Sequence, residues 1–225
     1  MNTKWLFVIG ALIASAVACA AAAAPAPASP TVSTLEPRSL ARAQTIQARL
    51  DARYRLLPAG GLAVTEATST GVVESFTLLT PDLLEARHLP ADNGIWYAIC
   101  PVRATCPYPA RRVARPAVDV VPRRLALELA LHTFLETSAD IVAVSLPTSR
   151  FTAFVVERME LAREVDMPRL AKTLGREPSR TLPATLERLV DRVTRPRVYL
   201  WIALEPTPSG RDSWAGVPRW PTVTG

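Results

Sequence analysis

The side chains that could do chemistry are few, and the first set lies in a leucine-rich segment at 122–137. Glu128, His132 and Glu136 recur every four residues, so a helix places them on one face, where carboxylates and an imidazole can ligate a metal ion. Arg124 precedes them at the same spacing, and alternating charges are also typical of a solvent-facing helical stripe. We therefore predict a solvated stripe, with no metal site and no cofactor.

A pair of carboxylates is the second candidate. Glu66 and Glu74 flank a turn at 65–71 and could meet across a hairpin, as the two acids of a glycoside hydrolase do. A serine-hydrolase triad is disfavoured, because neither of the two histidines has an evident serine or aspartate partner. Phosphate loops, dinucleotide fingerprints and nucleophile elbows are absent from the sequence. We assign no catalytic residue.

Cys100 and Cys106 form the third candidate, in a segment that contains prolines at 101, 107 and 109. These prolines disfavour a helix and predict a loop after a strand at 95–99. In an oxidising compartment, two cysteines this close favour a structural disulfide, which would stabilise the fold by about 2 kcal/mol. A redox-active pair is disfavoured, because the spacing differs from the two-residue motif and no helix follows.

The beginning of the chain indicates where these groups work. A lysine near the start, an apolar run at 5–18 and a series of alanines follow the order of an export signal. Three outcomes stay open: cleavage within 20–24, lipidation of Cys19, or retention of the apolar segment as an anchor. Residues 25–37 then form a Pro/Ala-rich linker, which is typical of an extended spacer. We predict an extracytoplasmic protein, secreted or held at the outer face of the membrane.

The charge pattern of the sequence does not identify a specific partner. The formal net charge is +6 and comes almost wholly from arginine. A basic balance can favour an anionic wall component or lipid head groups. Most of the arginines are interleaved with acids, however, and nucleic acid is not expected as the partner of an exported chain.

The elements that would position these groups mix helices and strands. Helices are predicted from apolar periodicity at 39–54, 122–137 and 183–193, with a helical turn at 81–87. Strands are predicted at 62–65, 71–79, 95–99, 141–146, 151–156 and 198–204. We expect the strands at 141–146 and 151–156 to form a hairpin and the strand at 198–204 to be central in the sheet. The fold class is therefore α+β. We expect a mixed or antiparallel sheet, packed against a mostly buried central helix and preceded by an amphipathic helix.

Domain boundaries follow from this pattern. Residues 1–24 are the signal, 25–37 the linker, 38–205 a single α+β domain and 206–225 an irregular C-terminal tail. In the tail, Arg211, Trp214, Arg219 and Trp220 are candidates for a partner contact. The alternative is that this segment caps the core.

Part of the chain also resembles a known family. Over residues 95–205, the order of a strand, an Arg111-Arg112-Val113 loop, an apolar helix, the run 144–148, a further strand and Val165-Asp166-Met167 is similar to the GerMN module of exported germination and cell-envelope proteins. The likeness departs from that module at Thr137-Ser138, where the family has Gly-Pro, and at Met167-Pro168, where it has Leu-Ser. The resemblance implies a non-enzymatic α+β module and no catalytic residues.

Taken together, these patterns predict an exported, non-catalytic cell-envelope protein that binds an envelope partner or forms part of a structure. The alternative is an extracytoplasmic hydrolase that acts on glycan through Glu66 and Glu74.

Overall fold

A computed structural model describes residues 35–57, 61–79, 85–102, 120–147, 152–176, 181–203 and 212–218. The chain divides into two units, Met1–Thr31 and Val32–Gly225, and every described residue belongs to the second. Its helices are α2 (Pro37–Arg55), α3 (Val120–Glu136), α4 (Arg158–Glu164), α5 (Met167–Leu174) and α6 (Ala184–Thr194). Its strands are β1 (Leu62–Ser69), β2 (Val73–Leu79), β3 (Ala86–Pro90), β4 (Gly94–Pro101), β5 (Ile141–Leu146), β6 (Thr152–Glu157), β7 (Val198–Ala203) and β8 (Asp212–Pro218).

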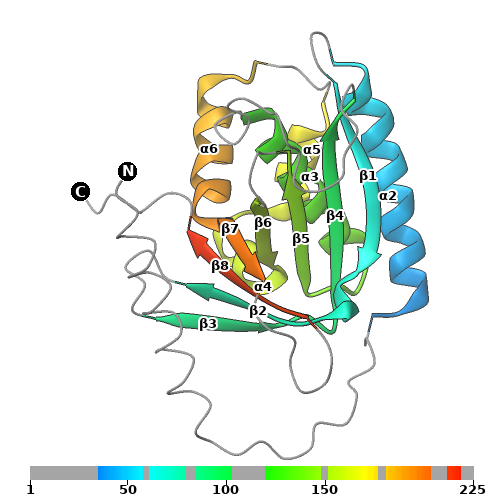
Figure 1. The fold of residues 1–225 in the computed structure, drawn as a ribbon. Coiled ribbons are helices and arrows are strands. Elements are labelled where there is room, and N and C mark those ends of the chain that lie inside the picture. Colours follow the sequence, from blue (N-terminus) through cyan, green and yellow to red (C-terminus); the bar gives the residue numbers. More distant parts are fainter. Residues whose placement is uncertain are drawn as a thin grey trace, which may run out of the picture. The chain divides into compact units, whose positions relative to one another are not determined.

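The strands form one mixed sheet in the order β1-β4-β5-β6-β7-β8-β2-β3 (Figure 1). The pairs β4/β5 and β2/β8 are parallel, and the other neighbours are antiparallel. The predicted α+β class with a mixed sheet is confirmed. So are the hairpin of β5 and β6 and the interior position of β7.

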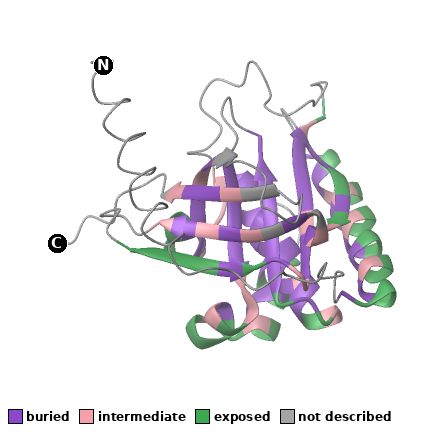
Figure 2. Cartoon of the chain, turned by 60° about the horizontal axis from the view of Figure 1, so that its bottom comes forward, coloured by how far each residue is buried: buried purple, intermediate pink, exposed green. Residues whose placement is uncertain are grey.

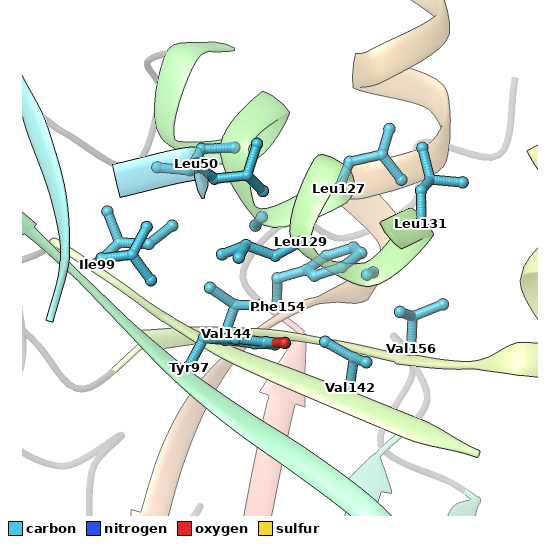
Figure 3. Close-up of a cluster of buried hydrophobic side chains, with 14 of the residues drawn as sticks. Leu50, Tyr97, Ile99, Leu127, Leu129, Leu131, Val142, Val144, Phe154 and Val156 are labelled. Carbon is cyan, nitrogen blue, oxygen red and sulfur yellow. The ribbon is translucent and has the colours of Figure 1, made fainter. Parts of the chain in front are cut away.

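The main core lies between the helices and one face of the sheet. Every residue of α3 from Val121 to Leu131 is buried, as expected of a helix that is apolar around most of its circumference. Figure 3 shows Leu127, Leu129 and Leu131 of this helix above Val142 and Val144 of β5. Helix α3 is thus the predicted buried central helix.

The predicted amphipathic helix at 39–54 is α2, which buries Ala43, Ile46 and Leu50 in the same core. The helix predicted at 183–193 is α6, which contributes Val190 and Val193. Figure 2 shows that the buried residues concentrate in the sheet and on the inner sides of the helices.

A second apolar cluster covers the other face of the sheet. Phe76 of β2 stacks on Trp96 of β4 at 6.1 Å between ring centroids and meets the edge of Trp201 of β7 at 5.2 Å. Ala143 and Ala153 belong to this cluster and are fully buried. Their small side chains leave room for the aromatic rings, so β2 packs against the central strands although it pairs with β8 and β3.

Three sequence-based predictions of local structure are wrong. Within the predicted irregular tail at 206–225, residues 212–218 form β8, an interior strand. The two strands around the turn at 65–71 do not form a hairpin, because β1 pairs with β4 and β2 pairs with β3 and β8. Ala86 and Arg87, expected in a helical turn, begin strand β3.

Helices α4 and α5 were not predicted. Asp166 accepts a hydrogen bond from the backbone N–H of Arg169 at 3.0 Å, and Pro168 lies in the first turn of α5. Both are ordinary signals of a helix N-terminus. Among the described residues, no helix combines the length and apolar character that a membrane span requires.

Candidate functional site

The polar stripe of α3, predicted to face solvent, is buried at its N-terminal end. Glu128 is 0% exposed and Arg124 is 2% exposed. They form an ion pair with Arg124 Nε 3.0 Å from Glu128 Oε1. The prediction of a solvated stripe is therefore wrong for this half of the helix.

Groups from α2 and from the end of α5 cover these charges. Arg53 Nη2 lies 2.9 Å from Glu128 Oε2, and the Tyr54 hydroxyl donates to Glu128 Oε1 at 2.6 Å. Arg124 Nη2 donates to the carbonyl of Leu174 at 2.7 Å. Burial raises the pKa of Tyr54 well above its ordinary value, and the neighbouring Glu128 carboxylate raises it further. The cluster is thus a scaffold that joins three helices.

The C-terminal half of the stripe is only partly covered. Glu136 forms ion pairs with Arg42 at 2.7 Å and Arg49 at 2.6 Å, and its Oε1 lies 3.1 Å from His132 Nδ1. Burial lowers the pKa of His132, and Arg49 lowers it further. Burial alone would raise the pKa of Glu136, but Arg49, Arg42 and His132 outweigh it and lower that pKa. Glu136 is consequently ionised and engaged by cations.

The metal hypothesis gains no support from this geometry. Within the described ranges, no three His, Cys, Asp or Glu side chains are grouped so that they could hold a metal ion. The carboxylate oxygens of Glu128 and Glu136 are instead engaged in contacts with arginines and a tyrosine.

The proposed acid pair is not supported by the topology. Glu66 is exposed on β1, an edge strand, whereas Glu74 belongs to β2, which is seventh in the sheet order. The hairpin that would have brought the two carboxylates together is absent, since β1 and β2 pair with other strands. The hairpin argument for this pair is therefore lost, and the glycan-hydrolase alternative stays a prediction.

Cys100 is 1% exposed on β4, and its sulfur lies 3.7 Å from Thr65 Oγ1 of β1. Cys106, its predicted disulfide partner, lies outside the described residues. The pairing therefore stays a prediction. Cys19, the predicted lipidation site, also lies outside them.

Of the four predicted tail residues, the structure describes only Trp214. It is partly buried in β8 and packs against the second apolar cluster. This position agrees with the core-capping alternative for Trp214. Arg211, Arg219 and Trp220 lie outside the described residues.

A cavity of about 420 Å³, which no sequence pattern indicated, lies at one end of the sheet. It lies where β3 and β6 end and where β4, β5 and α4 begin. Its walls are formed by Pro90, Asp92, Asn93, Asp140, Ile141, Glu157, Arg158 and Met159. Asp92-Asn93-Gly94 was recognisable as a turn, but only the parallel pairing of β4 with β5 brings it beside Asp140.

Comparisons of the chain with protein-family models, with characterised proteins and with solved structures find no match.

Proposed function

We propose that the chain is an exported, non-catalytic protein of the cell envelope that serves as a binding or structural module. The order of residues 1–24, charged then apolar then small, supports export. The predicted linker at 25–37 suits a tether between a membrane and a domain up to about Leu35, which packs in the main core just before Pro37 begins α2. The resemblance to the GerMN module belongs to this proposal and covers residues 95–205.

One observation supports the proposal that the protein is non-catalytic. The acids at the centre of the fold, Glu128 and Glu136, are held by arginines in contacts that join helices. A catalytic acid or base instead has to reach a substrate in a cleft, with a pKa suited to proton transfer. This arrangement supports a scaffold whose charges stabilise the fold.

Export is tested by placing charge in the apolar run. Leu12→Arg together with Ile13→Arg should retain the protein in the cytoplasm, because two charges disrupt an apolar signal. Thr3→Arg is the matched control, since it adds charge in the region that is already basic. Intact mass after fractionation identifies cleavage or lipidation at Cys19. Wild-type protein recovered from the cytoplasm with its first residues intact would contradict export.

The disulfide of Cys100 with Cys106 is tested on the same fractionated wild-type protein, again by intact mass. The mass should be two hydrogens below that of the reduced chain, and both thiols should resist alkylation until reductant is added. Complete alkylation without reductant would overturn this pairing and leave the export result untouched.

An anionic wall component is the partner that the tail arginines favour. Arg211→Ala with Arg219→Ala should reduce co-sedimentation with purified wall material, because two positive charges are lost. Arg163→Ala with Arg192→Ala is the matched control, since both side chains are exposed on α4 and α6. Equal reductions would mean that binding follows net charge and not the tail.

A further inference from the structure

The cations of α2 and α3 are largely engaged within the fold, as Arg53 and Arg124 are with Glu128, but those of α5 and α6 are not. The exposed cations in and directly after α5 and in α6 form no ion pair with any described residue; they are Arg169, Lys172, Arg176, Arg188 and Arg192. We call this set the α5–α6 basic face. Asp166 and Glu187 are the exposed acids of the same two segments, so positive charge predominates there.

Helix α5 holds its part of this face rigidly. Its apolar residues Leu170, Ala171 and Leu174 pack in the main core, and the cations of the basic face occupy positions between and beyond them. This is the amphipathic pattern of a helix that covers a core. The C-terminal end of α5 is fixed as well, because Arg124 donates to the Leu174 carbonyl at 2.7 Å. The α5 cations are therefore displayed on the outer side of an anchored helix.

Helix α6 extends this surface. Its Val190 and Val193 pack in the same core, whereas Arg188 and Arg192, four residues apart, are exposed. Both α5 and α6 pack on α3, and both lie on the same side of the sheet (Figure 1). Their exposed sides therefore belong to one side of the domain, which carries the basic face.

The chain that precedes the domain limits how far this face can lie from a membrane. Ten residues, 25–34, separate the predicted signal from Leu35, which packs in the main core. Ten residues span at most about 35 Å when fully extended, which is close to the diameter of a small domain. A segment before residue 25 that stays at the membrane, as an apolar anchor or through lipidated Cys19, would therefore keep the domain beside the lipid head groups.

We propose that the α5–α6 basic face binds the anionic head groups of the membrane at which the chain is held. Guanidinium groups form paired hydrogen bonds with phosphate, and the Lys172 ammonium adds a point charge. Each cation near an anionic bilayer strengthens binding about fivefold, and a tether raises the local concentration of the face. An anionic wall polymer would meet the same charges, but the short tether places lipid closer. The inference rests on the proposed attachment to the membrane and adds to it the surface that contacts the lipid.

Lys172 gives a direct test, because it is the only lysine of the chain after Lys4. Acetylation of the purified full-length chain is followed at Lys172 by mass spectrometry, with vesicles of phosphatidylcholine alone or of phosphatidylcholine and phosphatidylglycerol in equal parts. The rate at Lys172 should fall at least about fivefold on the anionic vesicles only, and this protection should disappear at high salt. The apolar run at 5–18 is present in both mixtures, so the difference reports the charge of the lipid.

Equal rates of acetylation on the two kinds of vesicle would overturn the proposal. They would leave the fractionation result for export unaffected, because no translocation takes place in this mixture. Protein that is protected on anionic vesicles but recovered from the cytoplasm of the cell would, conversely, contradict only the proposed export.

Variants that remove charge locate the contact. Arg169→Gln with Arg176→Gln should raise the lipid concentration that half-protects Lys172 about 25-fold, which is about fivefold for each cation. The start of α5 is preserved, because Asp166 accepts its hydrogen bond from the backbone of Arg169. Arg211→Gln with Arg219→Gln removes the same charge from the tail and should leave the protection unchanged.

Two results with these materials would also overturn the proposal. If the tail variant weakens protection as much as the α5 variant, binding follows net charge and not the basic face. If a purified anionic wall polymer protects Lys172 and anionic vesicles do not, the basic face binds the polymer and not the lipid.

Discussion

Arg53 of α2 and Glu128 of α3 form an ion pair of 2.9 Å in which the carboxylate is fully buried and the side chain of the arginine is 24% exposed. Arg124 and Tyr54 complete the surroundings of the carboxylate. A buried charge is tolerated only where partners replace the water that it loses. The packing of α2 on α3 therefore depends on a set of charges as well as on apolar surface.

Replacing Glu128 with alanine should destabilise the protein by at least about 3 kcal/mol, because it leaves Arg124 buried without its partner. Urea unfolding measures this loss. Glu66→Ala, an exposed acid on β1, is the control and should change the free energy of unfolding by less than about 0.5 kcal/mol. A loss below 1 kcal/mol for Glu128→Ala, on the same scale of buried-pair energies, would show that the cluster contributes little.

Alkaline pH should destabilise the protein through its buried tyrosines. Burial raises the pKa of Tyr54 and of Tyr97 above their ordinary value of 10.0. Above pH 10 the unfolded chain loses these protons while the folded chain keeps them, so stability is full below about pH 10 and falls as pH rises. The slope should reach about 1.4 kcal/mol per pH unit for each tyrosine. Urea unfolding between pH 8 and 11 measures it.

Tyr97→Phe is the matched variant for this test. It removes one titrating hydroxyl and the contact of 2.8 Å with Thr133 Oγ1. It should lower stability at neutral pH but reduce the alkaline slope. An unchanged slope would mean that Tyr97 ionises equally in both states.

Mild acid should also destabilise the protein, through His132. The pKa of His132 is lowered by burial and by Arg49, from an ordinary value of 6.5. The unfolded chain therefore takes up a proton first, so stability is full above pH 6.5 and is lost as pH falls toward the folded-state value. Melting temperatures measured between pH 7 and 5 should fall in the wild type. The decrease should be smaller in His132→Gln, and His88→Gln is the control for losing a histidine.

Ser145→Ala should leave the protein equally stable or more stable by about 1 kcal/mol. Ser145 is 1% exposed on β5, and its hydroxyl has no hydrogen-bond partner in the part of the chain that the structure describes. Removing an unpartnered buried hydroxyl recovers its desolvation cost. Thr70→Ala gives the contrast, since the buried Thr70 hydroxyl donates to the Ala91 carbonyl and its loss should cost about 1 kcal/mol. Destabilisation by both variants would point to a partner for Ser145 such as an ordered water.

The sequence predicted the elements whose pattern is strong and local. Helices α2 and α6 show apolar periodicity, α3 is a long apolar run whose polar residues recur every four positions, and β4 to β7 are rich in branched and aromatic residues. Strand β8 was missed because its Trp-Ala-Gly run between prolines is typical of a loop. Gly216 is used there because a side chain would approach Tyr199 Cβ to 3.0 Å, a constraint visible only once β7 and β8 are paired.

The error at Glu128 has a different physical origin. Charges four residues apart on one helix are usually solvated, and nothing local distinguishes Glu128 from such a residue. Its burial depends on Arg53 and Tyr54, more than 70 residues away, which supply a cation and a donor. Likewise, Asp140 and Asn93 meet only because the parallel pairing of β4 with β5 aligns their starts. The Glu128 cluster and the contact of Asn93 with Asp140 therefore both depend on segments that are distant in the sequence.

The position of β8 has a consequence for how the chain matures. Strand β2 is synthesised early but joins the central sheet through the much later strand β8, which lies between β2 and β7. Until residues 212–218 leave the ribosome or the translocation pore, β2 and β3 lack their hydrogen-bonded link to the other strands. A chain that ends before residue 212 would therefore lack the strand that joins β2 and β3 to β7, and its sheet would stay divided in two.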